Sequence, residues 1–579
     1  MSMNETFPYD DIIEEKFSSV ADAADEDLDT TLRRGGDYGV LAHQCTATMS
    51  RQLSRSLTVK RISASSLEDI DDAEDVTKSI PSKLKRSSLL RSALRARNRV
   101  KDRRLSYIGA ASRPPPASDT SEMFLGTTRM NRLVKEMQTC LDDLDASAEY
   151  PLLEKWACIV YESMSSPSRT FHSVHHVFDI SIEANSIQKL AAYFHDVVYY
   201  SIDGGLNEDQ NAFIGDLICE KDGVVSIVKG ESFDNNILMT MDIFGFEAGK
   251  VLDPFKGMNE FLSAALAVRC YQEVLDPVYL AHIAACIEAT IPFRKPDADG
   301  KTPIEYLYER MVKVNDTYNL ELVDIELVQS AQMAADLGNR DLGNFATPER
   351  AVFLSNTWNL LPESNISLRN TTVFRISNFA KALQKMTGFF ETLVPEDLFQ
   401  SFRDDEHEAI MAKKTEAARQ NIHVALNYMN CKRLSIAVVA AIAELTGGDA
   451  PLALFLGDLP ERHHVSTSIE DLIFCCDREP NPGVELDRRV FELLNDGRES
   501  ESNFDIKNSP LAAYIYSLIG TDGIDRCNKF AVHPMDKEKA VGVLTALPRE
   551  CVATIVAACA EIAITRRDAL DKMMKDLFE

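Results

Sequence analysis

From about Met123 onward, the apolar residues of this chain recur with the period of an α-helix. Segments with apolar residues at positions i, i+3, i+4 and i+7 include 130–145, 263–275, 323–337 and 419–429. This spacing places them on one face of a helix with 3.6 residues per turn. Runs that alternate apolar and polar residues, as strands do, are scarce. The pattern predicts an all-α body, with a first helical domain at 121–430 and a further helical region at 431–579.

The first 120 residues have a different composition. About 30 acidic, aromatic-poor residues precede a serine-rich basic tract, and the segment ends in the breaker "SRPPPASDT". Between Lys83 and Arg104, ten lysines and arginines face one acid, Asp102. Such segments bury too little apolar surface to offset chain entropy, so we predict a mostly disordered tail at 1–120. The basic tract is either a solvated charge run or a segment that docks on an acidic partner or on the body.

Serines in the tail follow basic residues at a spacing that kinases use. They are Ser54, Ser87, Ser88 and Ser106. A phosphate on any of them would cancel local positive charge. We therefore expect a kinase among the partners of the tail, with chance occurrence of these short motifs as the alternative.

The charge and the cysteines limit the classes of partner. With 62 basic and 90 acidic residues the net charge is −28, which repels nucleic acid and anionic membranes. The longest apolar runs, "IAVVAAIAEL" and "CVATIVAACAEIAI", are shorter than the ~20 residues that span a bilayer. Twelve scattered cysteines without a CxxC pair indicate reduced thiols. We expect a cytoplasmic protein that binds neither nucleic acid nor membrane.

Three of the eleven histidines lie in "FHSVHHVFDI", residues 171–180. His172 and His176 are four apart and share a face if the segment is helical, whereas His175 points elsewhere. Nineteen residues later, His195 and Asp196 follow an apolar run. A charged pair at the end of a buried helix is unfavourable unless something such as a bound cation compensates it. Imidazole and carboxylate ligands together suit Zn, Fe, Mn or similar divalent ions.

A third stretch, "VQSAQMAADLGNRDLGNF", supplies Asp336 and Asp341 after a further apolar segment. Three separate helical stretches thus each offer residues of the ligand type. The alternative is an all-helical scaffold whose histidines are incidental, because an isolated HD dipeptide or HxxxH spacing is a weak signal.

These stretches together resemble the HD-domain superfamily of metal-dependent phosphohydrolases. The matching residues, in three groups, are Arg169, Phe171, His172 and His176; Phe194, His195, Asp196 and Tyr199; and Asn207 and Glu208. The first group is also similar to the start of the cyclic-nucleotide phosphodiesterase signature. The resemblance covers about residues 158–402.

In the phosphodiesterases, the fourth metal ligand lies in an Ala-Asp-Leu-Ser-Asn run. Here "ADLGN" places Asp336 at that position, and the second "DLGN" makes Asp341 the rival. The segment "MTGFFETLV" is similar to a nucleotide-binding helix of that family, with Phe389 as the stacking residue. Met386 stands where those enzymes have the glutamine that grips the base, so the match does not extend to cyclic-nucleotide specificity.

The resemblance implies a role for each candidate residue. His176, His195, Asp196 and one of Asp336 and Asp341 would hold the metal. His172 would be the general acid, and Glu208 would orient His172 or a metal-bound water. Arg169 would contact the substrate phosphate, with a salt bridge as the alternative. "CIEATIPFRK" lacks the histidine that often serves a second metal, so one ion per chain is expected.

The function that follows is hydrolysis of a small-molecule phosphate ester, nucleotide-like esters included. A divalent ion (Zn, Fe, Mn or Mg) lowers the pKa of bound water from ~15.7 toward neutrality, and the hydroxide can attack phosphorus. The competing hypothesis is a catalytically weak HD-fold nucleotide sensor or scaffold that is regulated through its N-terminal tail. An intact ligand set favours the enzyme.

Overall fold

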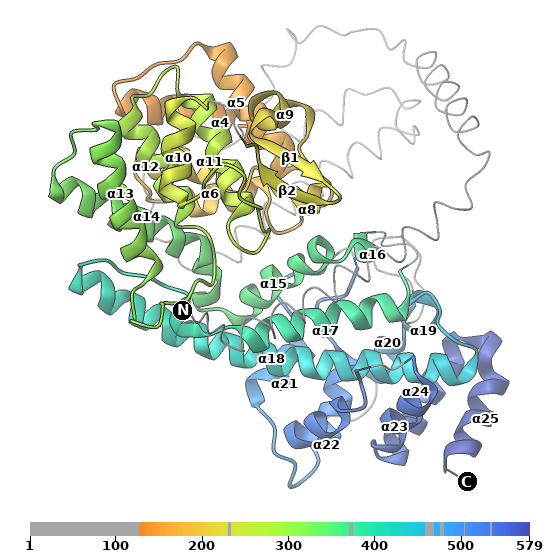
Figure 1. Cartoon of the computed structure of the whole chain (residues 1–579). Helices are drawn as coiled ribbons and strands as arrows, with labels where there is room; N and C mark the ends of the chain where they lie inside the picture. The colour runs from red at the N-terminus through yellow and green to blue at the C-terminus, as the bar shows by residue number, and fades with distance from the viewer. Residues whose placement is uncertain are drawn as a thin grey trace, which may run out of the picture. The chain divides into compact units, whose positions relative to one another are not determined.

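A computed structural model describes residues 127–229, 233–369, 374–457, 468–474, 480–502, 504–532 and 535–578 (Figure 1). All of these residues belong to one compact unit, 119–579. The expected tail at 1–120, its basic tract and its serines Ser54, Ser87, Ser88 and Ser106 lie outside the described residues.

The described chain is mostly helical, which confirms the predicted fold class. Its first part runs through α4 (Arg129–Asp143), α5 (Tyr150–Met164), α6 (Val174–Ser181), α7 (Ser186–Phe194), α8 (Tyr200–Asp203), α9 (Glu208–Ile214), η4 (Gly215–Leu217), β1 (Ile218–Lys221), β2 (Val224–Ile227), α10 (Asn235–Phe244), α11 (Met258–Tyr271), α12 (Pro277–Glu288), α13 (Pro303–Tyr318) and α14 (Asp324–Asp341). The antiparallel hairpin β1–β2 is the one sheet found among the described residues.

Local sequence explains where the helices near the histidines begin. Asn185 caps α7: its side chain accepts from the backbone N–H of Gln188, and the Gln188 side chain accepts from the N–H of Asn185. Asn207 and Gln210 form the same capping box at α9. Each box satisfies two of the backbone donors that a helix start leaves unpaired. The starts of the helices before and after His195 and Asp196 are therefore fixed at Asn185 and Asn207.

The first hydrophobic core lies among α4 to α14. Its central helices α11 and α12 are buried on nearly all sides, as expected for helices without a polar face. Trp156 of α5 and Phe194 of α7 both meet Tyr271 of α11 edge to face, with ring centroids 5.1 and 5.2 Å apart. Phe194 immediately precedes His195, so this aromatic cluster anchors the end of α7.

The second part of the described chain packs around one long helix (Figure 1). It comprises η5 (Leu342–Ala346), α15 (Arg350–Ser364), α16 (Ile366–Arg369), α17 (Ile376–Thr392), η6 (Pro395–Asp397), α18 (Asp405–Thr446), α19 (Ala453–Leu456), α20 (Ile469–Phe474), α21 (Arg488–Asp496), α22 (Pro510–Asn528), α23 (Lys537–Thr545), α24 (Arg549–Ile562), η8 (Ile564–Arg566) and α25 (Arg567–Phe578).

Helix α18 is the axis of a second hydrophobic core, which begins at Phe353. The apolar run at 436–443 is buried on every side within this helix, which explains its composition. The helix continues unbroken through Cys431. A division at 430–431 therefore falls inside α18 in this structure, and the division into functional domains stays a prediction.

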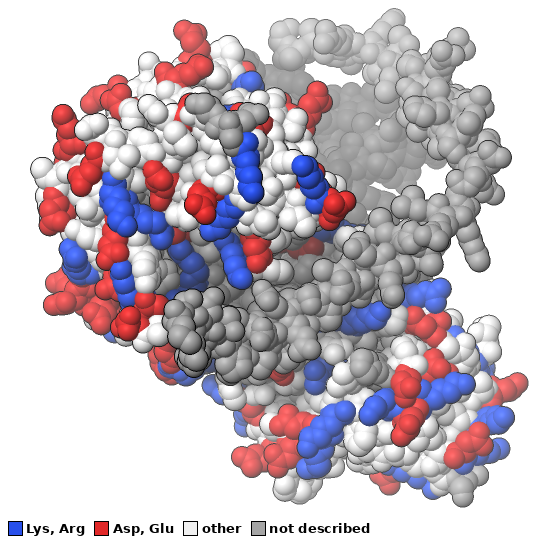
Figure 2. Space-filling model, viewed as in Figure 1, with Lys and Arg blue, Asp and Glu red and all other residues white. Residues whose placement is uncertain are grey.

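Lysines, arginines and acidic residues are interspersed on the face shown in Figure 2, so that face carries no field of a single sign. Within the described ranges, no individual helix has the length and apolarity to cross a membrane. Helices α23 and α24, bent by 117° at their break, meet those two criteria only as a pair. The nine cysteines that the described ranges contain are free thiols.

Candidate metal centre

Four residues from three parts of the chain meet in one cluster. His176 comes from α6, His195 and Asp196 from the end of α7, and Asp341 from the end of α14. Each offers one ligand atom, and the four atoms lie within 4.8 Å of one another. His176 Nε2 is 3.0 Å from Asp341 Oδ1, and His195 Nε2 is 2.9 Å from Asp196 Oδ2. Two imidazoles and two carboxylates are a donor set that could hold a divalent metal ion.

The orientation of His195 tests whether this cluster fits a metal. Its Nδ1–H donates to the carbonyl of Ala192 at 2.8 Å, which leaves the lone pair of Nε2 facing the cluster. This Nε2 is buried and has no hydrogen-bond partner. A backbone carbonyl that fixes the tautomer of a histidine is the usual support of a metal ligand. The unpartnered nitrogen between two carboxylates therefore fits a bound cation.

The electrostatics of the cluster point the same way. Burial alone would lower the pKa of His195, but the negative charges of Asp196 and Asp341 outweigh it and hold that pKa well above its usual value. Burial would raise the pKa of Asp341, yet the hydrogen bond from His176 and the nearby imidazole of His195 lower it to about 2. The carboxylates thus stay ionised and favour positive charge at the point where the four side chains meet. A divalent ion would supply that charge.

Asp341, rather than Asp336, is the fourth member of the cluster. The two are five positions apart on α14, which turns their side chains to different faces of the helix. Asp336 instead accepts hydrogen bonds from Arg340 Nε at 2.7 Å and from Gln188 Nε2 at 2.9 Å. Asp336 therefore ties α14 to α7.

His172 lies beside the cluster, but on a bend of the backbone rather than on the helix that was expected. Helix α6 begins only at Val174, so His172 lies in the bend before it, where the N–H of Ser173 donates to the carbonyl of Phe171. The ring of His172 nevertheless faces that of His176, with centroids 5.7 Å apart. Its Nε2 is 3.8 Å from Asp196 Oδ2. His175 is exposed and is not part of the cluster, as its spacing predicts.

The partner of His172 is Glu363, a residue that the sequence did not indicate. Glu363 lies near the end of α15 and is only 3% exposed. Its Oε2 accepts from His172 Nδ1 at 2.7 Å, and its Oε1 accepts from the backbone N–H groups of Phe171 and His172 at 2.6 and 3.0 Å. Both oxygens are thus used to hold one histidine and its bend.

This contact changes the protonation of His172. Burial would lower the pKa of the imidazole, but the charges of Glu363 and Asp196 outweigh it and raise the pKa to about 9. Burial would likewise raise the pKa of Glu363, whereas the charge of His172 and its hydrogen bonds lower it. At neutral pH the two form an ion pair. The Nε2–H of His172 then points to the cluster as an available proton.

Glu363, and not the Glu208 expected there, contacts His172 in this structure. Glu208 is an exposed residue in the first turn of α9, and among the described residues no contact links it to His172 or the cluster. Its neighbours have a structural role: Gln210, held by Asn207, donates from Nε2 to the carbonyl of Val197 at 2.9 Å. Asn207 and Gln210, rather than Glu208, therefore support the turn after Asp196.

Arg169, expected at the substrate phosphate, is instead a buried anchor for the same turn. It is 5% exposed and forms a salt bridge with Asp203. Its guanidinium also donates to the carbonyls of Asp196 and Val197. This is the salt-bridge alternative, with the arginine buried and Asp203 at the surface. The guanidinium is fully engaged and holds the backbone at Asp196, one of the four cluster residues, in place.

Phe389, expected to stack on a substrate, lies half-buried on α17. Its ring packs edge to face against Phe293 and Phe390, with centroids 5.5 Å away in each case. Met386, on the same helix, is buried. Within the described part of the chain, no contact connects Phe389 to the four-residue cluster.

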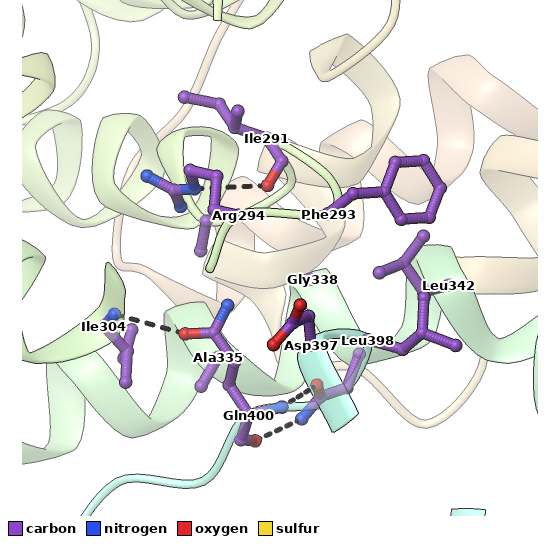
Figure 3. Close-up of a pocket in the computed structure, with 12 residues that line it drawn as sticks. Ile291, Phe293, Arg294, Ile304, Ala335, Gly338, Leu342, Asp397, Leu398 and Gln400 are labelled. Carbon is purple, nitrogen blue, oxygen red and sulfur yellow. Dashed lines mark hydrogen bonds between the residues drawn. The ribbon is translucent and has the colours of Figure 1, made fainter. Parts of the chain in front are cut away.

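Phe293 also borders a small pocket (Figure 3). Phe293 and Leu342 lie at one end of it and Ile304 at the other, with Arg294 and Gln400 between them. Its interior has room for about one water molecule, far less than a nucleotide needs. In this conformation the pocket is no nucleotide site.

A further carboxylate, that of the partly buried Glu260, lies close to the cluster at the start of α11. Its Oε2 is buried and has no hydrogen-bond partner. Burial raises the pKa of Glu260 to about 7, and the charges of Asp196 and Asp341 add to the rise. Glu260 therefore adds a third negative group near the cluster whenever it ionises.

We expect Glu260 to make the metal-free protein less stable as the pH rises. Its pKa is higher in the folded protein, about 7, than its ordinary value of 4.5. The folded state therefore binds the proton more tightly, and this stabilisation is full below pH 4.5 and lost through pH 7. Glu260→Gln cannot ionise, so in chelator its stability relative to wild type should increase from pH 5 to pH 8. Parallel curves from denaturant titrations would contradict the shift.

Comparison with known proteins identifies no relative: no family model matches the chain, and no curated protein or solved structure is significantly similar to it. The chain is thus a large helical domain with a buried His/His/Asp/Asp cluster.

Proposed function

We propose that this chain is a metal-dependent phosphohydrolase of the HD type, which hydrolyses a small phosphate ester. The observation that carries the proposal is the ion pair of His172 and Glu363 beside the four-residue cluster. A metal site that only stabilised the fold would have no use for a protonated imidazole pointing at it. A hydrolase needs both an ion and a proton donor.

The residues of the chain divide this work. His176, His195, Asp196 and Asp341 would hold the ion, which would supply an activated water and neutralise phosphoryl charge. His172 donates its Nε2 proton to the departing oxygen. Glu363 keeps that proton on Nε2 by accepting the Nδ1–H. Arg169 holds the carbonyls of the turn, so the two ligands at the end of α7 keep their spacing.

The test is hydrolysis of a panel of phosphate monoesters and diesters by the full chain, with Zn, Mn, Fe(II) or Mg added after chelation. Turnover that requires one of these metals, and that is lost in Asp196→Ala, supports the proposal. If no ester is hydrolysed but a nucleotide binds, the chain is a sensor or scaffold of the same fold. The acidic surface gives no general attraction for such anions, so binding should depend on the ion.

A further inference from the structure

Helix α15, which carries Glu363, lies between two other segments. Toward its C-terminal end, the carbonyl of Asn359 accepts from the hydroxyl of Thr170, and Glu363 holds Phe171 and His172. Asn359 and Glu363 are four apart and therefore share a face. This face of α15 sets the position of the bend that contains His172.

A second face of α15 is held by residues that follow α21. The N–H of Glu499 donates to the carbonyl of Ala351 at 3.2 Å, and the N–H of Ser500 donates to Ser355 Oγ at 3.1 Å. Trp358 Nε1 donates to Asp505 Oδ2 at 3.1 Å. Ala351, Ser355 and Trp358 follow the i, i+4, i+7 spacing of one helix face. The contacts fix both the rotation and the height of α15.

The anchor of this second face is a buried ionic network. Asp505 accepts from Lys432 Nζ of α18 at 3.0 Å and from Arg498 Nη1 at 3.2 Å. The guanidinium of Arg498 also lies over the ring of Trp358, 4.4 Å from its centroid. Lys432, Arg498 and Asp505 are 1, 2 and 5% exposed. Trp358 is thus held by its indole N–H and by its ring at once.

Such a network needs a reason other than stability. Two cations and a carboxylate lose their hydration on burial, and apolar residues of the same volume are often as stabilising. Unlike apolar packing, an ionic network makes directional bonds, and these can fix the position of one side chain. Here the position it fixes is that of Trp358, five residues before Glu363 on the same helix.

We propose that Lys432, Arg498 and Asp505 are positioning residues for the proton donor. They fix the position of Trp358 and therefore of α15. In that position Glu363 accepts hydrogen bonds from the backbone of Phe171 and His172 and from the His172 ring. The inference deepens the proposed function and rests on it for its effect on hydrolysis. It also gives the C-terminal helices a role, because α18 and the segment after α21 supply the network.

Trp358→Phe is the least disruptive test, because it removes the indole N–H and keeps an aromatic ring beneath Arg498. The matched control is Tyr516→Phe in α22, which likewise removes one hydrogen-bonding group from an aromatic side chain of the same core, where the Tyr516 hydroxyl accepts from the N–H of Asp487 at 2.8 Å. Asp505→Asn is the second variant, and it weakens the network at its centre.

The first measurement needs no substrate. Amide hydrogen exchange reports on the N–H groups of Phe171 and His172, which Glu363 protects. We expect these amides to exchange about 10-fold faster or more in Trp358→Phe and at the wild-type rate in Tyr516→Phe. Metal content should remain that of wild type in both, since the network touches none of the four ligands. Unchanged protection in Trp358→Phe and in a folded Asp505→Asn overturns the proposal.

The second measurement uses the metal-loaded full chain and two esters. Hydrolysis of a phenyl ester, whose leaving oxygen needs a proton, should fall by about 10- to 10²-fold in Trp358→Phe, the scale of a misplaced catalytic group. Hydrolysis of the 4-nitrophenyl ester should change far less, and the control should preserve the ratio of the two. Equal losses on both esters overturn the role in proton donation. Faster amide exchange in a chain that hydrolyses no ester would uphold the positioning and refute the proposed function.

Discussion

His172→Ala is expected to lower the hydrolysis of a phosphate ester with a poor leaving group by ~10²-fold or more, the usual loss when a general acid is removed. The metal content should not change, because His172 is outside the set of four ligands. An ester of 4-nitrophenol should be affected much less, since its departing oxygen barely needs the proton. Steady-state rates on the two esters and elemental analysis of the same preparation measure all three quantities.

Glu363→Gln should show the same selectivity together with a change in pH dependence. Activity requires protonated His172, so it falls as the pH rises through the pKa of that imidazole. The charge of Glu363 is among the causes that raise this pKa, after burial, which opposes it. Removing the charge should move the falling limb to lower pH. His175→Ala is the control, because His175 is exposed and outside the cluster; loss of metal in His172→Ala would refute the assignment.

The helical body and three of the four cluster residues could be predicted because their signals are local. Helical periodicity reports which face of each segment is buried, and that holds whatever the segment packs against. His176, His195 and Asp196 lie within 21 residues and follow apolar runs, so short motifs contain them. Even here the backbone differed, since His172 lies before α6 rather than on it.

Glu363 could not be predicted from the sequence, because its contact with His172 joins residues 191 positions apart. It belongs to a helix of the second core, and nothing local marks it as different from other acidic residues that end a helix. The two alternatives for Arg169 stayed open in the sequence for a related reason. An arginine beside a histidine motif contacts either the substrate or the backbone, and only the packing of the turn at 195–197 decides between them.

Asp336 and Asp341 could not be separated because both follow the same apolar stretch within "ADLGNRDLGN". The choice depends on where α14 ends and on the angle at which it crosses α6 and α7. The helix continues through Asp341, which brings its last residue to the ligands, while Asp336 faces Arg340 and Gln188. A repeated motif does not indicate which of its two aspartates faces the cluster.

This pair of aspartates also offers the sharpest test of the metal centre. Asp341→Ala is expected to remove about one tightly held divalent ion per chain and, with it, all metal-dependent hydrolysis. Only three ligands would remain, and the buried Nε2 of His195 would lose one of its two neighbouring carboxylates. Asp336→Ala, five residues away on the same helix, should retain the ion, because among the described residues its carboxylate bonds to Arg340 and Gln188 and to no member of the cluster.

Metal content is measured by elemental analysis of both variants purified without chelator. It decides whether Asp341 or Asp336 is the fourth ligand. Both remove one carboxylate from α14, so a general effect of charge or helix stability would appear in each. Loss of the ion from Asp336→Ala with retention in Asp341→Ala would reverse the assignment. Wild-type protein that carries no stoichiometric ion and binds none after dialysis against Zn, Mn, Fe(II) or Mg would refute the metal centre itself. In that case His195, whose pKa is raised, would be protonated at neutral pH. The cluster would then be an internal network of imidazolium and carboxylate groups.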